Sequence, residues 1–227
     1  MIRQENVDEI RQFEVFAKLN EKTLDKYLPH LYYRSYKKNQ YLFMEGDPRD
    51  KIFFLLEGYV MLEHANEQGS MQYLDFLKRK EMFPYNGLFT DDSFQYTAIA
   101  ATDIKVIFMQ TPILETLLKS TPKSLLHVII KQSQIIRNQE RRMQTTLLPN
   151  AQERVLHSLL YLMEGLGEKE PPEIIIPCPF TSAQLAKLSG TTRETVSHLL
   201  NQLKRDRIIS VESKKIRVHQ PDYFECT

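Results

Sequence analysis

Four polar side chains near the C-terminus have the types and spacing that suit hydrogen bonding to DNA bases. Arg193 and Glu194 are followed by Ser197 and His198, so on a helix all four would share one face. Arginine can donate two hydrogen bonds to guanine O6 and N7, and glutamate can accept one from cytosine N4. Ser197 and His198 lie one turn further on, near bases or phosphates. We therefore predict that this face reads base edges.

The residues around this face predict two helices joined by a tight turn. Thr181 or Ser182 is expected to cap a short first helix, and Thr191 or Thr192 is expected to cap the second. Between them Gly190 can take the positive φ that a tight turn needs. Two helices joined by such a turn form a helix-turn-helix, whose second helix lies in the major groove. We call this second helix, expected over residues 193–206, the recognition helix.

Basic side chains gather in this segment although the whole chain carries a formal net charge of only +1. Residues 181–220 contain eight Lys or Arg and three acids. We expect Lys204, at the far end of the recognition helix, and Lys214 and Lys215, in a following wing hairpin, to contact phosphates, which makes binding salt-dependent. The alternative is a sensor or adaptor module in which the basic face is merely solvated and the winged helix docks on protein.

The elements that precede this segment change in type along the chain. A helical apolar rhythm spans Val7 to Tyr27, and short strands separated by Gly-containing turns follow from about Tyr32 to Met109. Strands at this spacing predict an antiparallel sandwich or barrel. Thr111-Pro112 and Thr121-Pro122 each look like a cap followed by a helix start.

The second of these starts opens a long helix that reaches about Leu147. A heptad stripe runs along it, formed by Leu125, Ile129, Gln132, Ile136, Gln139, Met143 and Thr146. The stripe indicates either a homodimer or packing on the chain's own β-domain. Asn150, with Glu153 three residues on, resembles a capping box that begins the next helix, to Glu164, and a polar loop is expected at Gly165–Pro172. The predicted domains are thus 1–110, 111–149 and 150–227.

The residues 192–200, Thr-Arg-Glu-Thr-Val-Ser-His-Leu-Leu, resemble the recognition helix of the CRP/FNR superfamily of bacterial transcription regulators. Gly46-Asp47, the run Phe54–Val60 and Gly87-Leu88-Phe89 are similar to turns and strands of that family's β-roll, in the same order. The branch of arginine-deiminase operon regulators is the part of the family that the chain resembles.

The resemblance implies an α+β chain with an N-terminal antiparallel β-roll of the double-stranded jelly-roll type, a long dimerisation helix and a C-terminal winged helix-turn-helix. It also implies a homodimer on a palindromic, double-stranded operator with TGTGA-like half-sites. His198 stands where the family usually has arginine, which puts that contact in doubt. Residues of the Gly165–Pro172 loop lie where family members touch RNA polymerase, a further expected partner.

The residues of the family's cyclic-nucleotide pocket are replaced in this sequence. The family uses Gly-Glu and Arg-Ser or Arg-Thr pairs, where this chain has Pro84-Tyr85 and Gln95-Tyr96. Without the arginine a cyclic phosphate has no charge partner, so we do not expect cyclic AMP to bind. Tyr85, Asn86, Gln95 and Tyr96 are the candidate residues of an effector pocket, and the effector itself is left open.

Other chemistry has weak support in the sequence. The six histidines are scattered, which speaks against a metal-dependent jelly-roll enzyme, although haem bound by His30 or His64 is an alternative. Cys178 and Cys226 are too few for an iron–sulfur cluster and are expected to be plain thiols, with redox sensing as the other reading. We therefore expect no cofactor, no metal and no enzymatic activity.

No apolar run is long enough to span a membrane, and the polar first residues lack the apolar core of a signal peptide. We therefore expect a cytoplasmic protein that does not interact with membranes.

Overall fold

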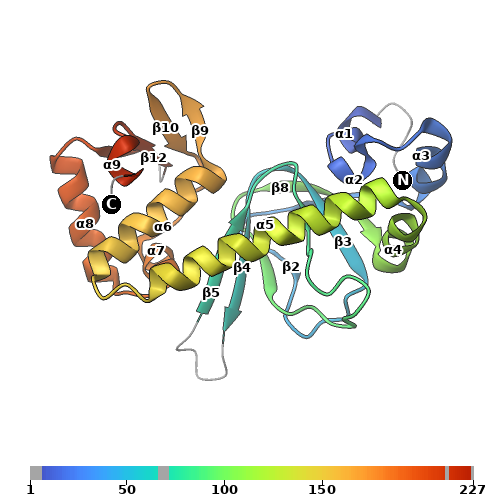
Figure 1. Ribbon diagram of the computed structural model, residues 1–227, viewed down its shortest axis with the longest axis horizontal. Helices are drawn as coiled ribbons and strands as arrows, with labels where there is room; N and C mark the ends of the chain where they lie inside the picture. The colour runs from blue at the N-terminus through green and yellow to red at the C-terminus, as the bar shows by residue number, and fades with distance from the viewer. Residues whose placement is uncertain (1–6, 66–71, 213–214, 226–227) are drawn as a thin grey trace. The chain divides into compact units, whose positions relative to one another are not determined.

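The computed structural model describes residues 7–65, 72–212 and 215–225, which form two compact units (Figure 1). The described residues of the first unit lie within 1–64 and 77–137, and those of the second lie within 65–76 and 138–227. Helix α5 (Pro122–Thr146) contributes to both units. The segment 65–76 lies far from the C-terminal residues in sequence but belongs to their unit. The predicted domain limits at residues 110 and 149 stay a prediction.

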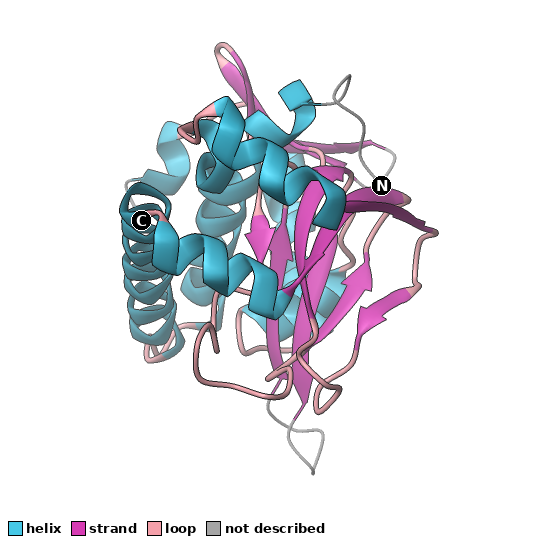
Figure 2. Ribbon diagram, turned by 90° about the vertical axis from the view of Figure 1, so that its right-hand side faces the viewer, coloured by secondary structure: helices cyan, strands magenta, loops and turns pink. Residues whose placement is uncertain are grey.

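The first unit contains a β-roll, and in the described residues three short α-helices and a 3-10 helix (Leu28–His30) precede its first strand. Its strands form antiparallel sheets of order β1-β8-β3-β6 and β2-β7-β4-β5 (strands magenta in Figure 2). The predicted antiparallel β-roll is thus confirmed. The elements up to α4 are α1 (Val7–Arg11), α2 (Glu14–Ala17), α3 (Glu21–Tyr27), β1 (Tyr32–Tyr36), β2 (Tyr41–Phe43), β3 (Lys51–Glu57), β4 (Val60–Ala65), β5 (Gln72–Leu77), β6 (Met82–Phe83), β7 (Thr97–Ala100), β8 (Ile104–Gln110) and α4 (Thr111–Ser120). Of these, β5 belongs to the second unit except for its last residue.

Strands β3 and β8 form the centre of the first sheet because their apolar runs can be buried. Phe54 is completely buried, and its ring centroid lies 5.2 Å from that of Phe13 and 5.0 Å from that of Phe16. The short helices thus cover the β3 side of the core. Thr111 does not cap α4 as predicted: Gln110 holds the N-cap position without a side-chain bond, and the Thr111 hydroxyl is buried.

The second unit contains the winged helix-turn-helix, which confirms the predicted C-terminal architecture. Its sheet has the order β11-β12-β10-β9. The elements are α6 (Ala151–Leu166), β9 (Glu168–Glu170), β10 (Glu173–Ile176), α7 (Ser182–Leu188), α8 (Arg193–Arg205), β11 (Ile209–Glu212), β12 (Lys215–Val218) and α9 (Asp222–Glu225).

Two local predictions in this unit need correction. The segment Gly165–Pro172 is not a plain loop, because α6 continues to Leu166 and β9 pairs with β10. Asn150 caps α6 by accepting a hydrogen bond from the backbone of Gln152. Glu153 accepts from the Asn150 side-chain amide instead of reaching back to its backbone, so the predicted capping box is not formed.

Candidate nucleic-acid interface

The helix-turn-helix is built by local capping bonds at both helix starts. The Thr181 hydroxyl accepts from the backbone N–H of Gln184 at 3.1 Å, and Gln184 Oε1 accepts from the Thr181 N–H at 2.8 Å. Thr192 accepts from the Thr195 N–H at 3.2 Å, and Gly190 has a φ of +58°. Of the alternatives at each start, Thr181 and Thr192 are therefore the caps, while Ser182 and Thr191 lie beside them.

The recognition helix α8 separates apolar from polar side chains by face. Its buried residues are Val196, Leu199, Leu200 and Leu203. Arg193, Glu194 and His198 are exposed and Ser197 is half-buried, all on the first two turns. The structure thus brings these four predicted residues together on one side of a helix whose opposite side is fixed in the core. Lys204 and Lys215 are also exposed, and Lys214 lies outside the described residues.

Arg154 of α6 connects the turn of the helix-turn-helix to the segment between α5 and α6. Its guanidinium donates to the carbonyl of Leu148 at 2.7 Å and to that of Pro149 at 3.3 Å. It also donates to the carbonyls of Ser189 at 3.2 Å and Gly190 at 3.1 Å. Sequence reasoning missed this role, because an arginine on a helix is usually taken for a solvated residue.

Hydrogen bonds and ion pairs within the second unit affect two charged residues of the basic segment, Glu194 and Arg217. Hydrogen bonds from its own backbone N–H and from the Thr192 hydroxyl hold the pKa of Glu194 below its usual range, which keeps this carboxylate ionised as an acceptor. Arg217 pairs with Glu173 at 2.7 Å and Glu170 at 3.1 Å. Its charge, counted above as part of the basic patch, is thus compensated within the wing sheet.

The four candidate effector residues differ in environment. Tyr85 is buried in the apolar core, where burial raises the pKa of its hydroxyl, whereas Asn86 and Gln95 are exposed. The Tyr96 ring centroid lies 6.0 Å from that of Phe43. Phe43 in turn belongs to a cluster of rings inside the roll, which also includes Phe53, Phe83 and Phe94.

The predicted heptad stripe of α5 divides into two sets. Ile129, Ile136 and Met143 are 50%, 57% and 67% exposed. Leu125, Gln132 and Gln139 are partly buried on their own chain. The Gln132 amide donates to the Tyr85 carbonyl at 2.9 Å, and that of Gln139 donates to the Tyr73 hydroxyl at 3.0 Å.

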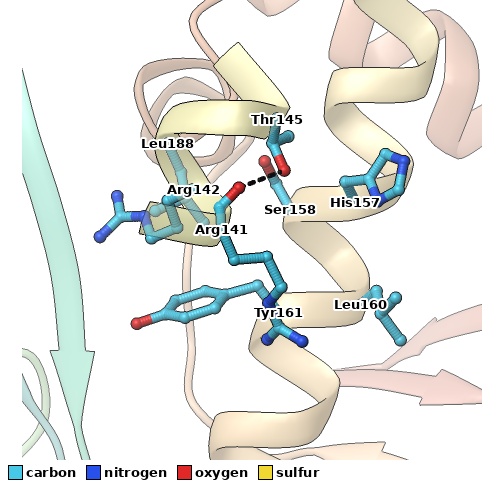
Figure 3. A pocket seen from close by; sticks show the side chains of 8 residues that line it. All are labelled: Arg141, Arg142, Thr145, His157, Ser158, Leu160, Tyr161 and Leu188. Carbon is cyan, nitrogen blue, oxygen red and sulfur yellow. Dashed lines mark hydrogen bonds between the residues drawn. The ribbon is translucent and has the colours of Figure 1, made fainter. Parts of the chain in front are cut away.

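A small open pocket in the second unit is lined by residues of α5, α6 and α7 (Figure 3). Its volume of about 30 Å³ is room for only one or two water molecules. Within its wall the Thr145 hydroxyl donates to the Arg141 carbonyl. The lining residues are Arg141, Arg142, Thr145, His157, Ser158, Leu160, Tyr161 and Leu188. An organic effector does not fit into this space.

His64, Cys178 and Cys226 are further candidates for cofactor or redox chemistry. His64 contacts Glu45 at 2.8 Å, and burial raises the pKa of Cys178 to about 12, which disfavours its reactive thiolate. Cys226 lies outside the described residues. Within the described part of the chain, no group of three or more potential metal ligands occurs. No helix there is both long and apolar enough to cross a membrane.

The N-terminal and C-terminal parts of the chain each match a known protein family. A family model described as a cyclic nucleotide-binding domain matches residues 33–121, and one described as a Crp-like helix-turn-helix domain matches residues 153–226. The global nitrogen regulator of Synechocystis sp. is 30% identical over 82% of this chain and 84% of its own. The HTH-type transcriptional regulator ArcR of Staphylococcus epidermidis is 28% identical over 93% of both chains.

A solved structure shares the fold of the chain. The structure of FixK2 from Bradyrhizobium japonicum superposes with a TM-score of 0.75 at 21% identity, over 86% of this chain and 96% of that one. The curated relatives are transcription regulators and not enzymes, which removes the jelly-roll enzyme as an alternative. With a 30% identical regulator aligned over most of both chains and a Crp-like helix-turn-helix domain, this chain belongs to the CRP/FNR family of DNA-binding transcription regulators.

Proposed function

We propose that this regulator binds, as a homodimer, a palindromic operator with TGTGA-like half-sites through the first turns of α8. One observation carries the proposal: Arg193, Glu194, Ser197 and His198 share the outer face of a helix whose inner face is buried. Such a helix can enter the major groove without disturbing its own core. The half-sites of a dimer should lie about 34–36 Å apart, one turn of the DNA helix.

Each side chain of this face has a distinct task in the proposal. Arg193 donates to guanine O6 and N7, and the ionised Glu194 accepts from cytosine N4. Ser197 and His198 contact neighbouring bases or phosphates. The helix starts and basic residues around them bind phosphates and fix the register of the protein on DNA. These are Thr181, Ser182, Thr191, Thr192, Lys204, Lys214 and Lys215.

The second copy in the proposed dimer covers the outer face of α5. Ile129, Ile136 and Met143 from the predicted stripe are joined by Leu126 on the same helix and by Leu147 directly after its end, which are 57% and 82% exposed. These five residues repeat at intervals of three, four or seven, as the seam of a coiled coil does. The proposed seam is therefore shifted from the predicted one towards the residues that do not pack on their own chain.

We further propose that the β-roll does not bind cyclic AMP. The exposed Gln95 stands where the resemblance places a phosphate-binding arginine, and Phe43 and Phe94 stack inside the roll with ring centroids 3.7 Å apart. These rings fill part of the interior of the roll. RNA polymerase is a further proposed partner, at the hairpin formed by β9 and β10, and the cytoplasm is the proposed place of action.

The deciding experiment is selection of genomic fragments bound by the purified protein, followed by footprinting. A palindromic site with two protected half-sites about one helical turn apart is the expected result. Arg193→Ala should then lower discrimination at one guanine by about 1–3 kcal/mol, while Arg205→Ala, at the far end of α8, should leave base preference unchanged. Unaltered discrimination in Arg193→Ala would refute the assignment of α8 as the reading helix.

A further inference from the structure

A buried polar cluster connects three segments of the second unit. Tyr73 and Asp75 come from β5, Gln139 and Arg142 from the last turns of α5, and Tyr161 from α6. We call these five residues the Asp75 cluster. The side chains of Asp75 and Arg142 are only 12% and 16% exposed. A buried carboxylate and guanidinium need well-placed partners, since an unpaired charge in the interior costs several kcal/mol.

Asp75 is the acceptor at the centre of the cluster. The Tyr161 hydroxyl lies 3.0 Å from Oδ1 and 2.9 Å from Oδ2, and the Tyr73 hydroxyl donates to Oδ2 at 3.1 Å. The Gln139 amide in turn donates to the Tyr73 hydroxyl. Burial raises the pKa of both tyrosines, so both hydroxyls stay protonated donors. One carboxylate therefore receives hydrogen bonds from two segments at once.

Arg142 is held from three directions. Its Nη2 donates to the Leu74 carbonyl at 2.7 Å, and its Nη1 lies 3.5 Å from Asp75 Oδ2. The guanidinium carbon also lies 5.1 Å and 5.2 Å from the ring centroids of Tyr73 and Tyr161, which is a favourable distance for cation–π attraction. Nη1 is buried without a hydrogen bond, so this charge depends on Asp75 and the two rings.

The cluster fixes two elements that the proposed DNA complex depends on. The last turns of α5 carry Met143, which belongs to the proposed dimer seam. Helix α6 carries Arg154, which holds the turn of the helix-turn-helix. Between the two helices only the residues 147–150 intervene. Because Arg142 and Tyr161 meet on one carboxylate, α6 cannot turn against the end of α5 without breaking buried bonds.

We propose that the Asp75 cluster sets the distance between half-sites that the regulator accepts. The inference rests on the proposed homodimer: if α5 forms the seam, the direction of α6 decides how far apart the two recognition helices lie. One additional base pair moves a half-site by about 3.4 Å along the axis and rotates it by about 34°. A rigid α5–α6 junction rejects such a shift, whereas a loosened junction tolerates it.

The test measures gel-shift affinities for synthetic duplexes with two TGTGA-like half-sites whose separation is varied in steps of one base pair. A duplex with one half-site serves as reference. The wild-type chain should prefer one separation strongly. The preference is the ratio of the affinity at the best separation to the affinity at neighbouring separations. Asp75→Asn and Tyr161→Phe should each lower this ratio about tenfold, the equivalent of about 1.4 kcal/mol. Binding to the single half-site should stay within about twofold of wild type.

Glu164→Gln is the matched control, because Arg141 and Glu164 form an exposed ion pair between the same two helices. Exposed pairs contribute little, so the preference should be retained in this variant. Tyr161→Phe keeps the ring and decides the matter if Asp75→Asn does not fold. Lower thermal stability with an unchanged separation preference would overturn the inference. Should the wild-type chain bind two half-sites no better than one, the proposed dimeric function would fail instead.

Discussion

Replacement of Arg154 by methionine should destabilise the second unit more than the same replacement of an exposed arginine does. Methionine keeps most of the apolar stem but removes all four hydrogen bonds to carbonyls. The bonds to Leu148 and Ser189 are partly shielded from solvent, whereas water can replace those to Pro149 and Gly190. A hydrogen bond from a charged donor contributes about 1.5–3 kcal/mol. Two such bonds at the lower limit give about 3 kcal/mol.

Thermal unfolding followed by circular dichroism and calorimetry measures this loss. For a unit of about 100 residues, 1 kcal/mol corresponds to a change of about 4–8 °C in the midpoint temperature of unfolding. The midpoint for unfolding of the second unit should therefore be lower by at least about 12 °C. Arg205→Met is the matched control, because Arg205 is exposed on α8 in the same unit. A transition temperature of Arg154→Met equal to that of Arg205→Met would refute the role given to the four bonds.

Three further results are expected. Ile136→Glu combined with Met143→Glu should convert the dimer to a monomer in light scattering at micromolar concentration, because charges then face each other across the seam; a dimer that persists would count against α5 as the interface. Calorimetric titration with cyclic AMP should give no binding heat, and saturable binding would disprove the interpretation of the roll. Hydrogen bonds from His219 and Arg217 hold the pKa of Glu173 below its usual 4.5, so its contribution to stability is present above about pH 4.5 and is lost as the pH falls through the lowered pKa. In Glu173→Gln the free energy of unfolding, measured by urea titration at a series of pH values, should therefore depend less on pH in the acid range. An equal dependence of this free energy on pH in both proteins would contradict the role given to Glu173.

The parts of the fold that follow from local signals could be predicted from the sequence. Thr181, Gly190 and Thr192 act within three residues of themselves, as caps and turn, and the apolar runs of β3 and β8 predict buried strands by composition. The face of α8 follows from helical periodicity. These features gave the architecture and the four residues of the candidate reading face.

The remaining features depend on partners that are distant in sequence. Strand β9 consists of Glu, Lys and Glu, which have no strand preference, and forms because β10 offers backbone partners. Arg154 binds carbonyls 35 and 36 residues away. The two sets of α5 residues share one heptad pattern, and only the position of the roll decides which set faces outward. No periodicity in a single sequence contains this information.

The discontinuous composition of the second unit has a consequence for how the chain folds during synthesis. Asp75 and Tyr161 are 86 residues apart, and the hydrogen bond between them closes a loop that contains strands β6, β7 and β8 as well as helices α4 and α5. Contacts of such separation form late and slow down folding. Strand β5 leaves the ribosome long before α6 is synthesised. The N-terminal roll can therefore fold first, and β5 can then serve as a template on which the DNA-binding unit completes its structure.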